Sequence, residues 1–103
     1  MSARTTDDVY IEAARSILES PLLAYKVEPY IDGDRWDFPR LLKDAQAWSS
    51  GEQILVRLAA ELFNSRLPKK PVRVSELVET LDEQNFEVAI SAIRMLRPVG
   101  GRW

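Results

Sequence analysis

The chain has 103 residues, of which 46% are apolar and 29% are charged, and its formal net charge is −2. This length supports one hydrophobic core, and the composition is that of a globular protein rather than a disordered chain. Cysteine and histidine are both absent, which excludes disulfides, thiolate or imidazole zinc ligands, and catalysis by either side chain. The slightly acidic balance gives no general attraction to nucleic acids or anionic membranes.

Three helices and one irregular segment are predicted before residue 49. Each helix has apolar residues at spacings of three or four, together with a capping residue or a proline in its first turn. The irregular segment contains Pro29, which ends the preceding helix, and the turn-forming pair Asp32-Gly33. In chain order the elements are a helix over residues 6–19, a short helix over 22–26 capped by Ser20, a small hairpin or an ordered loop over 28–38, and a helix over 38–48 capped by Asp37.

Residues 50–66 carry the strongest helix signal in the chain. Ser49 and Glu52 have the spacing of a capping box, in which each side chain accepts a hydrogen bond from the other residue's amide. The apolar face is wide and needs partners on several sides, so we place this helix at the centre of the fold. The face consists of Ile54, Leu55, Val56, Leu58, Ala59, Ala60, Leu62 and Phe63, while Arg57 and Glu61 lie on the predicted solvent side.

A basic connector, residues 67–71, follows the central helix, and its two prolines restrict the backbone. Two further helices are predicted over residues 76–81 and 83–96, and Asp82 caps the second of them. The residues expected to be buried in these two helices are Leu77, Val78, Leu81, Phe86, Ala89, Ile90, Ile93 and Leu96.

Together these elements predict an all-α fold, a compact bundle of five or six helices in a single domain over residues 1–103. Residues 1–5 and 98–103 lie outside the periodic segments, so we expect tails that are flexible or that become ordered on a partner. No apolar run approaches the roughly 20 residues that cross a bilayer, and the first residues lack the apolar stretch of a signal peptide. We therefore expect a cytoplasmic location.

The string from Ser49 to Gln53 resembles the signature motif of ABC-type ATPases, which also opens a helix and contacts a nucleotide phosphate. The resemblance covers only this short string. The chain has no Gly-rich phosphate loop with a lysine, which that chemistry requires. We therefore interpret the string as a capping box, and we expect no nucleotide and no other cofactor.

Two other patterns leave alternative functions open. Residues 75–97 have the order of a helix-turn-helix, whose second helix would present Gln84 and Asn85 to DNA beside three acidic residues. The acidic residues of segment 32–37 form a cluster that is suited to a metal ion or to hydrolysis, although its spacing differs from that of an EF-hand calcium loop.

The candidate partner-binding residues are cationic and aromatic. Lys69, Lys70 and Arg73 form a local positive patch that suits an acidic protein surface or an RNA backbone. Trp36 and the C-terminal Trp103 are aromatic residues of the kind that is enriched at protein interfaces. Since the usual catalytic side chains are missing, we predict a non-enzymatic protein-interaction module that binds another protein or a second copy of itself.

Overall fold

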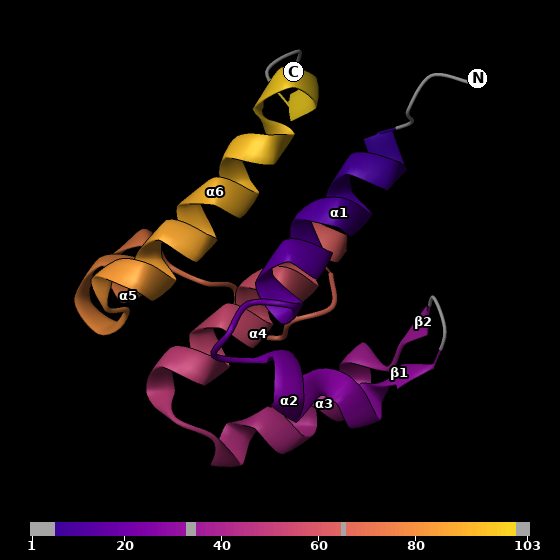
Figure 1. Cartoon of the computed structure of the whole chain (residues 1–103), viewed down its shortest axis with the longest axis vertical. Helices are drawn as coiled ribbons and strands as arrows, with labels where there is room; N and C mark the ends of the chain where they lie inside the picture. The colour runs from indigo at the N-terminus through magenta and orange to yellow at the C-terminus, as the bar shows by residue number, and fades with distance from the viewer. Residues whose placement is uncertain (1–5, 33–34, 65, 101–103) are drawn as a thin grey trace.

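The computed structural model describes residues 6–32, 35–64 and 66–100, and within these it describes the side chains from residue 9 to residue 97. The described residues form a compact, mostly helical fold with one small hairpin, which confirms the predicted fold class (Figure 1). The helices are α1 (Thr6–Leu18), α2 (Ala24–Val27), α3 (Phe38–Asp44), α4 (Ser50–Phe63), α5 (Val74–Thr80) and α6 (Glu83–Gly100), with 3-10 turns η1 (Glu28–Tyr30) and η2 (Ala45–Ala47) and strands β1 (Ile31–Asp32) and β2 (Arg35–Trp36).

Helix α4 lies at the centre of the fold, as its wide apolar face predicts. It packs against α1, α3, α5 and α6, and α1 also packs against α6. Figure 1 shows α1 and α6 running side by side in opposite directions, with the hairpin at the other side of the molecule. Leu55, Val56 and Ala59 have no exposed surface, so this one helix supplies much of the core.

Ser49 and Glu52 form the predicted capping box at the start of α4. The Ser49 amide donates to Glu52 Oε1 over 3.0 Å, and the Glu52 amide donates to Ser49 Oγ over 3.4 Å. The helix ends at Phe63 rather than at residue 66. Asn64 adopts an extended conformation, and its side-chain oxygen accepts the Arg66 amide over 3.0 Å, which replaces a further helical turn.

Replacing Ser49 with alanine is expected to lower the free energy of unfolding by about 1 kcal/mol, because the first turn of α4 loses its cap. Urea unfolding followed by circular dichroism measures this change. Ser50→Ala is the matched control, since Ser50 is exposed in the first turn and its side chain makes no capping bond. A loss from Ser50→Ala as large as that from Ser49→Ala would contradict the assigned cap.

The irregular segment forms a hairpin rather than a loop. Ile31 pairs with Trp36 and Asp32 pairs with Arg35 in an antiparallel ladder, while residues 33–34 at its tip lie outside the described part of the chain. Asp37 follows the hairpin and caps α3 as predicted, since its carboxylate accepts the amide three residues ahead over 3.2 Å. The α-helical part of the predicted helix over 38–48 ends at residue 44 and continues as η2.

Ser20 does not cap the second helix, which corrects the prediction for this segment. Its hydroxyl donates to the Ile17 carbonyl over 2.6 Å, so the hydroxyl continues the end of α1. The Ser20 carbonyl accepts the amides of Leu23 and Ala24 over 3.0 and 2.9 Å. Residues 21–23 therefore form a turn, and α2 begins only at Ala24.

Helices α5 and α6 bury a narrower face than predicted. Val78 and Ile93 were expected in the core, but they are 63% and 39% exposed. Ala92, which was not expected there, is fully buried, because α6 is rotated so that its alanine side meets the core. The core residues of this region are Leu77 on α5, Leu81 directly after it, and Ala89 and Ala92 on α6.

The boundaries of these two helices also differ from the prediction. α5 begins at Val74 rather than at residue 76, because the Glu76 carboxylate accepts the Arg73 amide over 3.0 Å and closes the helix start there. α6 continues through Pro98 to Gly100, so the predicted tail is helical over residues 98–100, whereas residues 101–103 lie outside the described part. A proline so near the end removes only one amide donor. None of the described helices is long and apolar enough to cross a membrane.

Candidate functional site

Arg57 fixes the connector and α5 against α4. Its guanidinium donates to the carbonyls of Lys70 and Pro71 over 3.0 and 2.8 Å. It also donates to both carboxylate oxygens of Glu76, over 3.0 and 3.1 Å. The predicted solvent position of Arg57 is therefore wrong, since its side chain is only 18% exposed beneath the connector.

Glu61, one turn further along α4, gives the chain after the connector a second attachment. Its carboxylate accepts the Val72 amide over 2.9 Å. Arg57 and Glu61 were both predicted on the solvent side, and both instead hold the segment that follows α4. These bonds satisfy backbone groups that have no partner in a helix or strand.

The Arg57 guanidinium lowers the pKa of the Glu76 carboxyl from 4.5 to about 2, mainly through the hydrogen bonds that it donates. The Arg73 amide acts in the same direction. The folded protein therefore binds a proton at Glu76 less readily than the unfolded chain does. This difference stabilises the fold above the ordinary carboxyl pKa and is lost as the pH falls through the folded value.

We accordingly expect the free energy of unfolding to fall between pH values of about 5 and 2, and Glu76 to carry a measurable part of that fall. Glu76→Gln should be less stable than the natural chain at about pH 7, and the two should converge towards pH 2. Urea unfolding across this range measures the difference. Glu79→Gln, an exposed substitution on the same helix, is the control. A stability difference for Glu76→Gln that does not change with pH would contradict the assignment.

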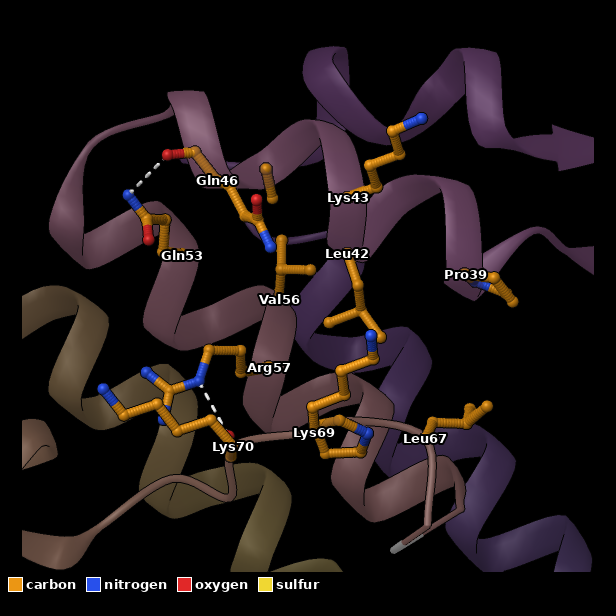
Figure 2. A pocket seen from close by; sticks show the side chains of 12 residues that line it. Pro39, Leu42, Lys43, Gln46, Gln53, Val56, Arg57, Leu67, Lys69 and Lys70 are labelled. Carbon is orange, nitrogen blue, oxygen red and sulfur yellow. Dashed lines mark hydrogen bonds between the residues drawn. The ribbon is translucent and has the colours of Figure 1, made fainter.

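A pocket of about 480 Å³ opens between α3, η2, α4 and the connector, beside the Arg57 attachment (Figure 2). This volume lies within the range of pockets that bind ligands in proteins, roughly 300 to 1,000 Å³. Leu42 on α3 and Leu67 on the connector are half-buried and provide apolar surface to it. The residues that line it are Pro39, Leu42, Lys43, Ala45, Gln46, Gln53, Val56, Arg57, Leu67, Pro68, Lys69 and Lys70.

The charge of this basic pocket has one sign. Lys43, Arg57, Lys69 and Lys70 line it, and no carboxylate is among the described residues of the lining. Arg57 is paired with Glu76. The three lysines form no ion pair in the described part of the chain, although the charge of Lys70 also helps to lower the pKa of Glu76. Although the net charge of the protein is −2, this pocket is locally positive and attracts anionic groups.

The side chains of the pocket point in different directions (Figure 2). Lys69 extends from the connector towards Leu42, whereas Lys70 extends the opposite way, past Arg57. The Gln46 amide reaches towards Val56 from the opposite rim. The two ammonium groups therefore lie towards different ends of the connector, and the Gln46 side-chain amide lies across the pocket from them.

The predicted site residues are only partly brought together. Lys69 and Lys70 line the basic pocket, but Arg73 lies beyond it and contributes its amide to the start of α5. The Trp36 ring packs edge-on against two phenylalanine rings, with centroid distances of 5.5 and 5.8 Å, and it does not line the pocket. Trp103 lies outside the described residues. Sequence reasoning missed Lys43, whose only signal is a cation one position after the apolar Leu42.

A second charged cluster stabilises the start of α4. The Lys26 ammonium lies 2.9 and 2.8 Å from the two oxygens of Glu52, and 5.2 Å from the centroid of the Trp48 ring. Burial raises the pKa of Glu52, but hydrogen bonds from Lys26 and Ser49 outweigh it and leave that pKa below its ordinary value. Every charged group in this cluster has a partner, so we assign it to stability.

The two alternative sites, the acidic cluster over residues 32–37 and the helix-turn-helix over residues 75–97, have less support from the described residues. Asp37 uses its carboxylate to cap α3, Asp34 lies outside the described part, and no three acidic side chains that are described gather closely enough to hold a metal ion. α5 and α6 follow one another as in a helix-turn-helix. The Asp82 carboxylate at the start of α6 accepts the Asn85 amide over 2.8 Å, which places negative charge where DNA phosphates would approach.

No model of a known protein family matches the chain, and no curated protein and no solved structure matches it.

Proposed function

We propose that the chain is a non-enzymatic interaction module that binds an acidic segment of a partner protein in the basic pocket. The observation that carries the proposal is the pocket's charge, because three lysines that form no ion pair line it beside apolar side chains and no carboxylate is described among its lining residues. Such a site attracts an anionic partner and disfavours cationic ones. The apolar surface adds affinity that charge alone would not supply.

The attachment of the connector supports the same proposal. Lys69 and Lys70 are neighbours on a segment with two prolines, and Arg57 holds that segment through the carbonyls of Lys70 and Pro71. The two ammonium groups are therefore carried by a backbone that is already ordered before a ligand arrives. Less conformational entropy is lost on binding when the site is held in this way.

The uncovered apolar edge of α5 is a second feature of an interaction module. Val74 and Val78 lie one turn apart on α5 and are 76% and 63% exposed, and Ile93 on α6 is 39% exposed. Contiguous exposed apolar patches mark surfaces that contact other proteins, and Val74 and Val78 are neighbours on one side of α5. Their occupant is not specified by charge, so the basic pocket carries the proposal.

The test is a titration of the protein with three fluorescent peptides of equal length. Each contains one leucine, and the residues around it are acidic, neutral or basic. Only the acidic peptide is expected to bind, and its affinity should fall as salt screens the lysines. The double substitution Lys69→Glu with Lys70→Glu should weaken that binding by about tenfold or more.

The matched control is Arg94→Glu with Arg97→Glu, which makes the same change in net charge on exposed positions of α6 away from the pocket. This variant should keep most of the affinity. Equal losses in the two double variants would mean that general electrostatics, and not the pocket, attracts the peptide. Binding of the basic or neutral peptide as tightly as the acidic one would also contradict the proposal.

A further inference from the structure

We infer that the basic pocket recognises an extended segment in which one apolar side chain has a carboxylate on each side. This inference rests on the proposed function and specifies the partner's chemistry. In this arrangement Lys69 and Lys70 each contact a different carboxylate of the bound segment. A single acidic group would need only one of them.

The directions of the two lysines carry the inference. Lys69 extends from the connector towards Leu42, and Lys70 extends in the opposite direction past Arg57, so their ammonium groups lie towards different ends of the connector (Figure 2). Both residues lie at bends of the connector, and it is the path of the chain there that sends their side chains in different directions. A ligand that lies along the connector therefore meets one cation near α3 and another near α5.

The apolar surface that a ligand can reach beside these cations comes from Leu42 and Leu67. Both side chains are half-buried and line the pocket, whereas Val56 has no exposed surface. A charged side chain placed here would lose water without gaining a partner, whereas an aliphatic or aromatic side chain gains contact area. The position between the two carboxylates is therefore expected to be apolar.

Groups that bind a peptide backbone are present at the opposite rim. The side-chain amide of Gln46 reaches towards Val56, and this side chain makes no hydrogen bond in the described part of the chain. The neighbouring Gln53 amide is already used, since it donates to the carbonyls of Trp48 and Gln46 over 2.7 and 3.3 Å. Gln46 therefore supplies both a donor and an acceptor to a bound backbone, which favours a peptide over a small dicarboxylate.

Arg57 does not contact the ligand in this arrangement. Its guanidinium is occupied by two carbonyls and by the Glu76 carboxylate. We assign it as a positioning residue that holds the connector, while Lys69 and Lys70 make the charge contacts. The specificity then resides in the two lysines and in the apolar surface beside them.

The experiment uses four synthetic peptides that contain a central leucine, with acidic residues on both sides, on the N-terminal side only, on the C-terminal side only, or on neither side. Binding is measured by calorimetry for the full chain and for Lys69→Gln and Lys70→Gln. We expect the doubly acidic peptide to bind best, with about a fivefold loss when either acidic side is replaced by neutral residues. Replacing the central leucine by serine should give a loss of similar size.

The decisive result is the pairing of losses. Lys69→Gln should abolish the effect of one acidic side and Lys70→Gln that of the other, which a double-mutant cycle detects. If both substitutions reduce the effect of the same side, or if serine replaces leucine without loss, the inference is wrong. Acidic peptides that still bind and still depend on both lysines would then leave the proposed function intact. If no peptide binds, or if a free dicarboxylate such as glutarate binds as tightly as the peptide, both the inference and the proposed function are wrong.

Discussion

The substitution Arg57→Met is expected to lower the free energy of unfolding by about 2–3 kcal/mol, because it removes a group that makes four hydrogen bonds to the connector and α5. Methionine keeps the apolar stem of the side chain, so the loss measures mainly the guanidinium. Exposed ion pairs contribute about 1 kcal/mol or less, but this one is largely covered and also binds two backbone carbonyls. Chemical unfolding at neutral pH measures the change.

Arg94→Met provides the control for this experiment, since Arg94 is exposed on α6 and has no hydrogen-bond or ion-pair partner in the described part of the chain. It should change the stability by no more than about 0.5 kcal/mol. Arg57→Met should also lower the affinity for the acidic peptide, because the connector that carries Lys69 and Lys70 is no longer held. A variant as stable as the control would show that the attachment contributes nothing to the fold.

Leu55→Ala is expected to have the largest effect on stability, with a loss of about 2–5 kcal/mol. Leu55 has no exposed surface and lies on α4, which contacts four of the other helices, so the surrounding core cannot easily close the cavity. Thermal and urea unfolding both report this loss.

Val78→Ala tests whether burial is the cause. Val78 is aliphatic and lies in a helix, but it is 63% exposed. The alanine variant should therefore unfold within about 0.5 kcal/mol of the natural chain. If Val78→Ala were as damaging as Leu55→Ala, the uncovered edge of α5 would have to be buried in solution.

Features that depend on a few neighbouring residues were predictable from the sequence. The capping box at Ser49 and the cap at Asp37 each require only a side chain and an amide three residues away. The wide apolar face of α4 likewise follows from the spacing of its residues, and a face of that width requires a central position. The hairpin was one of two open alternatives, because two such short strands depend on the packing around them.

The attachment of the connector was not predictable in this way. Arg57 and Glu76 are 19 residues apart, and their contact depends on the path that the chain takes between α4 and α5. Helical periodicity places Arg57 off the apolar face but does not reveal which later segment covers it. The positive patch at Lys69 and Lys70 was predictable, because these residues are neighbours in the sequence. The pocket that combines them with Leu42 and Val56 was not, because it joins segments that are far apart in the sequence.

The wrong prediction that Val78 and Ile93 are buried has a related cause. Val78 belongs to the same apolar stripe as Leu77 and Leu81, and periodicity alone predicts that the whole stripe is buried. The helix has only seven residues, and the core covers Leu77 and Leu81 of this stripe but leaves Val78 exposed. Ile93 is exposed on α6 in a similar manner, since the alanine side of that helix faces the core.

The central claim is that the basic pocket is the surface that binds the acidic partner, and mapping by nuclear magnetic resonance tests it most directly. Isotope-labelled protein is titrated with the doubly acidic, leucine-containing peptide while amide and methyl signals are recorded. We predict that the signals of Leu42, Val56, Lys69 and Lys70 shift as the peptide binds, while those of Ile93 on α6 stay in place. Shifts confined to α5 and α6, or no shifts at saturating peptide, would contradict the claim.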